Sequence, residues 1–292
     1  MLRQHSVCDF STSESWVILS PIEQSIKRKI EAVGTPLKDW DIQINYGIKT
    51  GCNEAFIITT EKRNEILANC QTEEERARTE ELIRPIIRGR DIKRYGYEWA
   101  DLWLIATFPS LHYDIEEYPA VKAYLMSFGI ERLEQTGKKY VINGEEVKAR
   151  KKTNNKWFET QDSINYWQDF LKPKIIWKRV GSILRFGYND NGALGLDSTC
   201  FATGKQIEYL CCVLNSPMGH YLLKDSPKTG TGDLLISVQA VEPIKVPLIN
   251  EEENSKFKNL FKTHQENEIN REVYELYNLS EEEIKFIMDN YY

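Results

Sequence analysis

The apolar residues near the start of the chain recur at helical intervals. An isoleucine stands at every fourth position across residues 22–30, Ser20 and Pro21 precede this run, and Gly34 follows it. Serine is a preferred N-cap, proline suits the first helical turn, and glycine commonly ends a helix. The spacing therefore predicts a helix that begins at Pro21 and ends before Gly34.

The next segment has the two-residue period of a strand. Residues 40–47 (WDIQINYG) alternate between apolar and polar side chains, and residues 55–59 (AFIIT) form a second short apolar run. The stretch between them is polar and contains Lys49, Thr50 and Gly51. Because two strand-like runs separated by a glycine-containing turn are typical of a hairpin, we expect a β-hairpin across residues 40–59.

Helix-like and strand-like stretches are interspersed through the rest of the chain. The pattern predicts helices at 64–70, 72–83, 117–136 and 205–217, and strands at 100–107, 173–180 and 182–188. Residues 136–161 are polar and indicate a long loop or a hairpin around Asn143-Gly144, a pair that favours a type I′ turn. The fold class is therefore α+β: a mixed β domain with flanking helices and a C-terminal helical segment.

Three segments are expected. Residues 1–40 hold an N-terminal strand and a spacer helix, residues 41–250 form the central domain, and residues 251–292 form an acidic helical segment. Ser280 and Glu283 have the spacing of a capping box in that last segment, and its apolar positions form stripes that we expect to pack within the chain.

The net charge of −6 hides an uneven distribution. Residues 251–292 hold 11 acidic and 5 basic residues, so the preceding part is neutral, and its basic residues gather in the runs 84–94, 138–156 and 172–185. A local basic face attracts a phosphate backbone whatever the total charge is. The alternative that these runs solvate separate surfaces stays open.

The cysteines and histidines show no metal-ligand spacing. Six cysteines and four histidines are scattered, with no C-x-x-C pair, so reduced and mostly buried thiols are expected, as in a cytoplasmic protein. The sequence shows no apolar run of about 20 residues and no apolar signal-peptide core. We expect the protein to be cytoplasmic.

Common enzyme signatures are missing. The stretch GIKTG is too short for a phosphate-binding P-loop, no G-x-G-x-x-G opens a helix, and G-x-S-x-G and H-E-x-x-H do not occur. Glu146-Val147-Lys148 has the form of a nuclease Glu-x-Lys triplet, but no aspartate stands at a strand end just upstream. We therefore expect no catalytic residue, no metal and no cofactor in this chain.

Several motifs in order resemble one known family. INYGIKTGCNEAFIIT, RPIIRGRDIKRY, WLIAT, LNSPMGHYLLK and GDLLISVQAVEPIKVPLI resemble the TaqI-like C-terminal specificity domain, and REVYELYNLSEEEIKFI resembles its terminal helical signature. That domain occurs in Type IIG restriction-modification enzymes and related adenine-specific DNA methyltransferases. The resemblance covers nearly the whole chain from about Ile22.

The resemblance implies a target-recognition domain at 41–250 that reads a short sequence of double-stranded DNA. It implies that S-adenosylmethionine and Mg²⁺ belong to methyltransferase or nuclease domains outside this chain, and that a methyltransferase domain or subunit is the protein partner. The chain itself is expected to be a specificity domain, not an enzyme.

Basic and amide side chains are the expected DNA contacts, because they donate to phosphate and read base edges. The candidates are Lys49, Thr50, Asn53, Arg88, Arg90, Lys93, Arg94, Lys138, Lys139, Lys151, Lys152, Asn154, Asn155, Lys156, Lys178, Arg179, Lys228 and Thr229. The loop 138–156 is the expected base-reading element, and in it Asn154 and Asn155, with Gln161 beyond it, suit adenine.

Some of these residues also have a structural interpretation. Asn53 either touches DNA or only shapes its turn. Arg90 either contacts DNA or pairs with Asp91 or Glu54. Trp157 and Tyr166 either stack on bases or anchor the core.

Two other functions remain as alternatives to DNA recognition. One is a metal-dependent nuclease that uses Asp114, Glu116, Glu146 and Lys148. The other is a protein-interaction subunit that acts through the helical tail.

Overall fold

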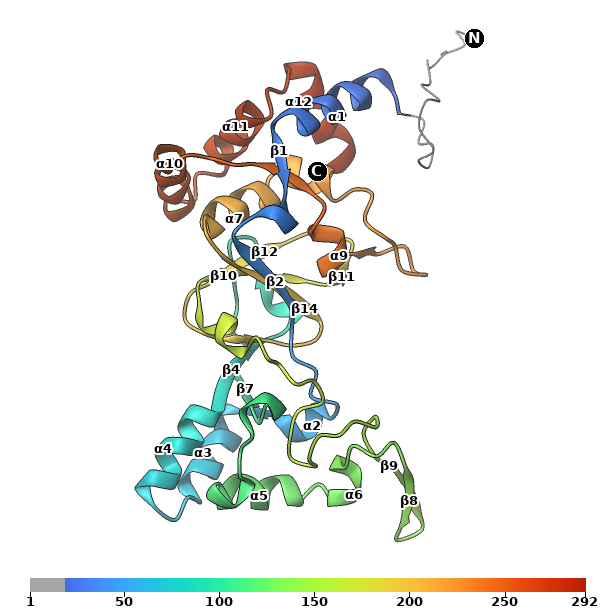
Figure 1. Ribbon diagram of the computed structural model, residues 1–292, viewed down its shortest axis with the longest axis vertical. Coiled ribbons are helices and arrows are strands. Elements are labelled where there is room, and N and C mark those ends of the chain that lie inside the picture. Colours follow the sequence, from blue (N-terminus) through green and yellow to red (C-terminus); the bar gives the residue numbers. More distant parts are fainter. Residues whose placement is uncertain (1–18) are drawn as a thin grey trace. The chain divides into compact units, whose positions relative to one another are not determined.

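The computed structural model describes residues 19–292, which form two compact units (Figure 1). The first unit comprises the chain up to Ile42, residues 181–184 and residues 205–292. The second comprises residues 43–180 and 185–204. The expected segment 41–250 is thus divided between the units, since residues 205–250 belong with the terminal helices. The N-terminal strand expected before the spacer helix lies outside the described residues.

In the second unit, two four-stranded sheets carry the core. One has the order β12 (Phe186–Asn189), β10 (Lys174–Lys178), β14 (Thr199–Gly204), β2 (Ile42–Tyr46). The other has the order β13 (Leu194–Gly195), β4 (Ile83–Ile87), β7 (Leu102–Ile105), β3 (Ile57–Thr59). All strand pairs given with a register are antiparallel except β13 with β4, which is parallel.

Five helices accompany these sheets among the described residues of the second unit. They are α2 (Asn53–Phe56), α3 (Thr60–Ala68), α4 (Glu73–Leu82), α5 (Pro119–Met126) and α6 (Ile130–Leu133). One apolar core joins helices and sheets, because Phe56, Val121 and Phe201 belong to the same buried cluster. The predicted helices at 64–70 and 72–83 and the strand at 100–107 are confirmed.

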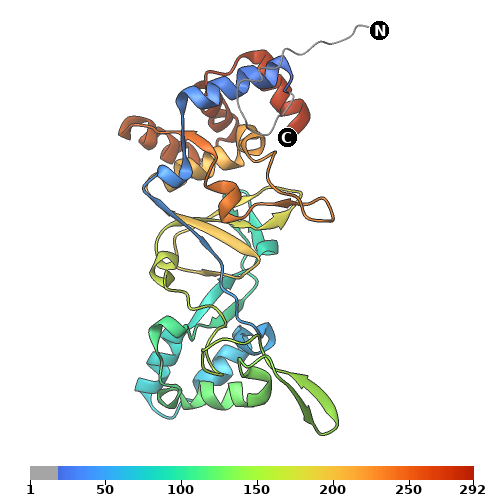
Figure 2. The same ribbon diagram turned by 45° about the vertical axis from the view of Figure 1, so that its right-hand side comes forward.

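Two small hairpins complete the second unit. One pairs β5 (Ile92–Lys93) with β6 (Gly96–Tyr97), and the other pairs β8 (Lys139–Ile142) with β9 (Glu145–Lys148). The β8–β9 hairpin is the long green extension in Figure 2. Asn143 and Gly144 both have positive φ, at 54° and 86°, as a type I′ turn requires. The hairpin predicted at this dipeptide is confirmed.

The hairpin predicted across residues 40–59 is wrong. β2 and β3 lie in different sheets, and the short helix α2 stands between them. The backbone N–H of Gly47 donates to Thr199 O at 3.0 Å, and that of Ile48 donates to Gly195 O at 2.7 Å. These long-range hydrogen bonds take the places that a local hairpin partner would have filled.

The first unit is mainly helical. Its helices are α1 (Pro21–Val33), α7 (Ile207–Asn215), α8 (Pro217–Leu222), α9 (Val238–Val241), α10 (Glu251–Lys262), α11 (Glu266–Leu276) and α12 (Glu281–Tyr291). β1 (Gly34–Pro36) pairs with β16 (Lys245–Pro247). β15 (Leu234–Leu235) is a two-residue strand, and β11 (Val180–Gly181) has one residue in each unit. The predicted N-cap at Ser20 and the predicted capping box at Ser280 are both confirmed, and Ser20 also forms a capping box with Glu23.

The acidic tail packs inside the first unit. Phe257 of α10 lies against Tyr209 of α7, with ring centroids 4.7 Å apart. Tyr277 is fully buried, and its hydroxyl donates to Lys245 O at 2.8 Å. Lys29 of α1 pairs with Glu283 of α12 at 2.6 Å. The predicted intramolecular packing of the tail is confirmed.

Candidate nucleic-acid interface

The turn that follows β2 is held by its own side chains. The Thr50 hydroxyl donates to Asn53 Oδ1 at 2.6 Å, and the Cys52 N–H donates to Thr50 Oγ1 at 3.1 Å. Thr50 is fully buried, so a direct contact between its side chain and an external phosphate is excluded in this conformation. Of the two interpretations of Asn53, the turn-shaping one is the one this hydrogen bond supports. Lys49 is exposed.

Arg150 fixes the same turn to neighbouring segments through hydrogen bonds. Its guanidinium donates to the carbonyl oxygens of Leu133, Thr50, Glu159 and Trp157 at 2.7 to 2.8 Å. The side chain is only 4% exposed, and burial lowers its pKa to about 10. Although it lies in the basic run 138–156, Arg150 is therefore an internal support rather than a surface contact.

A second turn, residues 195–199, was not anticipated from the sequence. The Arg179 N–H donates to Ser198 O at 2.9 Å, and the Gly89 N–H donates to Ser198 Oγ at 3.1 Å. The hydrogen bonds from Gly47 and Ile48 reach Thr199 and Gly195 at its two ends. The turn thus brings together three predicted segments: the residues around Lys49, those around Arg88–Arg90, and Lys178–Arg179. The stretch G-L-D-S-T between two strands was the sequence feature that could have indicated this turn.

Two cavities open beside these turns, and they share Lys49 and Asp197. The larger, of about 560 Å³, is lined by five basic residues and two acidic ones: Lys49, Arg132, Lys148, Arg150, Lys151, Glu54 and Asp197. The smaller, of about 420 Å³, is lined by polar and aromatic residues that include Lys49, Asp162, Ser163, Asn165, Tyr166, Arg179 and Asp197. We call the lining of both cavities the Lys49 surface. Arg132, Ser163, Asn165 and Asp197 were missed as candidates, and Lys148 was considered only as a nuclease residue.

Comparison with known proteins decides the family. The profile of the TaqI-like C-terminal specificity domain matches residues 84–239, which is more than half of the chain. The chain belongs to this family of specificity domains. No curated protein matches it.

One solved structure agrees with this assignment at the level of the fold. The specificity domain is similar to the Type IIL restriction-modification enzyme MmeI, solved in complex with DNA, at 12% identity and a TM-score of 0.55, over 89% of this chain and 36% of that one. The type IIG restriction endonuclease BpuSI matches at 10% identity and a TM-score of 0.47, over 82% of this chain and 27% of that one. The chain therefore spans about a third or less of the length of these two enzymes.

The arginine cluster of the specificity domain is partly engaged. Arg88 forms a two-point pair with Asp91, at 2.9 Å from Nε and 2.8 Å from Nη2. Burial alone raises the pKa of Asp91, but the hydrogen bonds from Arg88 outweigh it and leave this pKa below its ordinary value. The two acids considered as alternative partners of Arg90 are thus engaged by other arginines: Asp91 pairs with Arg88, and Glu54 pairs with Arg132. Arg90 is exposed.

The remaining candidates of the second unit differ in ion pairing and in solvent exposure. Lys93 pairs with Glu98 at 3.0 Å, and Lys139 pairs with Glu146 at 2.8 Å. Arg94 and Arg179 are half-buried, and the guanidinium of Arg179 lies over the ring of Tyr46, 5.9 Å from its centroid. The exposed candidates are Lys138, Lys139, Lys151, Lys152, Asn154, Lys156 and Lys178.

Two side chains of the expected base-reading region serve the fold instead. The Asn155 amide donates to Thr160 O at 3.3 Å and to Gln161 O at 2.9 Å, so its donors are already used and the adenine contact predicted for it is not available. The Tyr166 hydroxyl donates to Tyr46 O at 3.1 Å, and its ring packs near Phe170 and Phe201. Burial raises the pKa of Tyr166 to about 12. Tyr166 is therefore a core anchor.

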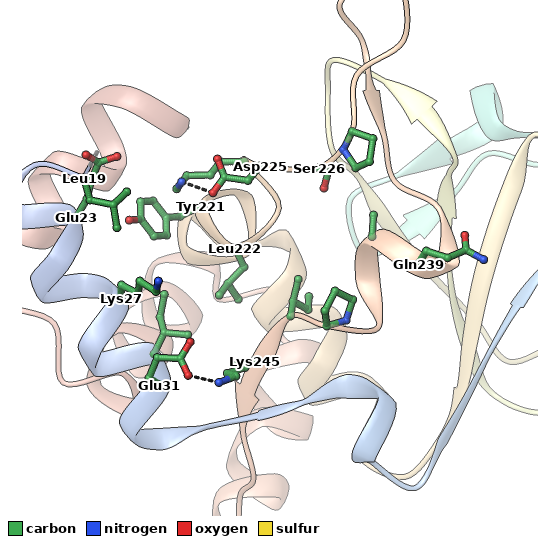
Figure 3. Close-up of a pocket in the computed structure, with 16 residues that line it drawn as sticks. Leu19, Glu23, Lys27, Glu31, Tyr221, Leu222, Asp225, Ser226, Gln239 and Lys245 are labelled. Atoms are coloured by element: carbon green, nitrogen blue, oxygen red, sulfur yellow. Dashed lines mark hydrogen bonds and ion pairs between the residues drawn. The ribbon is translucent and has the colours of Figure 1, made fainter. Parts of the chain in front are cut away.

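Lys228 and Thr229 lie in the first unit and are not part of the Lys49 surface. Their loop closes on itself, because the Thr229 N–H donates to Asp233 O at 2.8 Å and its hydroxyl lies 2.8 Å from that of Thr231. The first unit also contains a cavity of about 450 Å³ between α1 and residues 221–227 (Figure 3). Its charged lining is balanced, with three acidic and three basic side chains, and it includes the Glu31–Lys245 pair.

The residues proposed for a nuclease do not form a metal site. Among residues 19–292, no group of three or more His, Cys, Asp or Glu side chains is placed to hold a metal ion. Glu116 pairs with Lys122 at 2.6 Å, and Asp114 caps a short 3₁₀ helix. In the part of the chain that the structure describes, no helix is long and apolar enough to cross a membrane.

Proposed function

We propose that this specificity domain reads a short target in duplex DNA with the Lys49 surface of its second unit. The observation that carries the proposal is the convergence of Lys49, the Arg88–Arg90 segment and Lys178–Arg179 on the 195–199 turn, beside two polar cavities. The family membership supports it, because the matched profile is that of a specificity domain.

The surface offers both kinds of contact that sequence recognition needs. Exposed cations such as Lys49, Lys148 and Lys151 can bind phosphates and fix the register of the protein on the duplex. Ser163 and Asn165 line the smaller cavity and are exposed, so they can reach base edges in the major groove. Arg150 and the 195–199 turn hold these groups in place.

Catalysis belongs elsewhere in this proposal. The chain matches about a third of MmeI, which leaves room for other domains in a whole enzyme of this kind. S-adenosylmethionine, Mg²⁺ and the chemistry of adenine methylation or strand cleavage would be supplied by a methyltransferase domain or subunit and by any nuclease domain, in the cytoplasm. This specificity domain would supply the recognition of the target sequence.

Salt-dependent binding to a duplex tests the proposal. The full chain should bind randomised double-stranded DNA with an affinity that falls steeply as salt rises, because each neutralised phosphate releases counterions. The double variant Lys49→Glu, Lys151→Glu should bind at least about tenfold more weakly and lower the salt slope by about 1 to 2. Lys285→Glu, an exposed change in α12, is the matched control and should keep wild-type binding. Equal binding by both variants would contradict the proposed surface.

A further inference from the structure

Asp197 is an unpaired carboxylate in the middle of the Lys49 surface. It lines both cavities and is half-buried. Among the hydrogen bonds and ion pairs of residues 19–292, none engages its carboxylate, whereas the other acid of the larger cavity, Glu54, is paired with Arg132. Asp162, the other acid of the smaller cavity, accepts a hydrogen bond from the backbone of Lys49. Asp197 is thus a carboxylate of the basic surface that no hydrogen bond or ion pair of the described residues engages.

A surface that only bound phosphate would bind better without this group. A carboxylate repels phosphate oxygens and lowers the local positive potential. The same group is well suited to accept a hydrogen bond from an exocyclic amino group on a base, such as N4 of cytosine or N6 of adenine. Its position among phosphate-binding cations therefore indicates base readout rather than backbone binding.

The backbone around Asp197 is fixed firmly enough for this task. The Leu196 N–H donates to Ile87 O at 3.0 Å, and the Thr199 N–H donates to Leu196 O at 2.8 Å. Gly47 approaches so closely that a Cβ there would stand 1.9 Å from Leu196 O. Recognition of a single hydrogen-bond donor requires such a preorganised position.

We propose that Asp197 is a specificity-determining residue that accepts a hydrogen bond from the amino group of one base in the major groove of the target. This inference rests on the proposed function. It concerns one base pair of the target, whereas the cations around Asp197 set the affinity for all sequences.

Selection from a randomised duplex library with the full chain tests the inference. Wild type should select a motif with cytosine or adenine at the position read by Asp197, and the base found there identifies which amino group is bound. Asp197→Leu and Asp197→Ala, neither of which has a side-chain acceptor, should lose about tenfold or more of the preference at that one position and keep the others. Circular dichroism of both variants establishes that they are folded.

Glu54→Gln is the matched control, because it removes the same charge from the same cavity. It should tighten binding to all sequences alike and leave the selected motif unchanged. If both Asp197 variants select the wild-type motif at every position, or change affinity uniformly as Glu54→Gln does, the inference is wrong. If wild type binds duplex DNA but selects no motif, or does not bind it, the proposed function itself fails.

Discussion

The guanidinium of Arg150 donates to the backbone carbonyl of Thr50 across 2.8 Å, although 100 positions separate the two residues. Three further carbonyls, those of Leu133, Trp157 and Glu159, share the same side chain. A single buried cation thus fixes the turn that carries Lys49 to the segments that carry Arg132 and Lys151. The geometry of the larger cavity depends on it.

Arg150→Met should destabilise the protein strongly. It removes a donor from four carbonyl oxygens, of which Glu159 O keeps the Gln135 amide at 3.1 Å. The other three lose their Arg150 donor, and each such loss costs about 1 kcal/mol or more, so a total of at least about 3 kcal/mol is expected. Urea denaturation measures this. Arg132→Met, at a half-exposed arginine of the same cavity, is the control and should cost less than about 1 kcal/mol. Similar losses for both variants would show that the four hydrogen bonds do not support the fold.

Gly47→Ala should disrupt the contact between the two turns. The new Cβ would stand 1.9 Å from Leu196 O and 2.6 Å from Thr199 Oγ1, so the backbone must move. We expect a loss of at least about 2 kcal/mol in unfolding free energy, as for other overpacked sites, and weaker duplex binding. Gly96→Ala is the control, since nothing lies within 4 Å of a Cβ placed there, and it should be tolerated.

The Arg88–Asp91 pair predicts a stability loss in acid. The folded-state pKa of Asp91 is lowered, so its contribution is present above the unfolded value of about 3.9 and is lost as pH falls through the folded pKa. Asp91→Asn should therefore cost about 1 to 3 kcal/mol at pH 7, and the cost should shrink as pH falls through the folded-state pKa of Asp91. Denaturation of both proteins across pH 2.5 to 7 measures the difference. A pH-independent cost would mean that the charge of Asp91 contributes nothing.

Lys174 predicts a dependence on pH of the same sign, but in a higher pH range. It is fully buried, its ammonium donates to Phe170 O at 2.6 Å and Asn189 Oδ1 at 2.5 Å, and burial lowers its pKa to about 7. Because the folded pKa lies below the unfolded one, the unfolded chain binds the extra proton between them, and stability should rise with pH above 7. We expect a gain of about 1 to 2 kcal/mol between pH 7 and 8.5, with a flat profile over this range for Lys174→Met.

Local features of the fold were predictable, and long-range ones were not. The caps at Ser20 and Ser280 and the turn at Asn143-Gly144 depend on residues within three or four positions, so the sequence displays them. β2 and β3 looked like partners because they are close in sequence, yet β2 joins β14 and β3 pairs with β7. Pairing between distant strands leaves no short-range pattern to read.

The candidate site shows the same division. Residue type and charge predicted Lys49, Arg90 and Lys151, all of which are exposed. The internal roles of Thr50, Asn155 and Arg150 depend on carbonyl and side-chain partners that only the folded chain supplies. Asp197 was missed because a lone aspartate is uninformative until its basic neighbours are known.

The turn at 195–199 is held by main-chain hydrogen bonds and by the hydroxyls of Ser198 and Thr199, and the side chain at position 197 takes no part in these contacts. Replacing this side chain need not disturb the scaffold that carries it. Under the role proposed for Asp197, a change of target at one base would require only the exchange of this side chain, at little cost in folding free energy. Stability and target choice would then vary separately at this position.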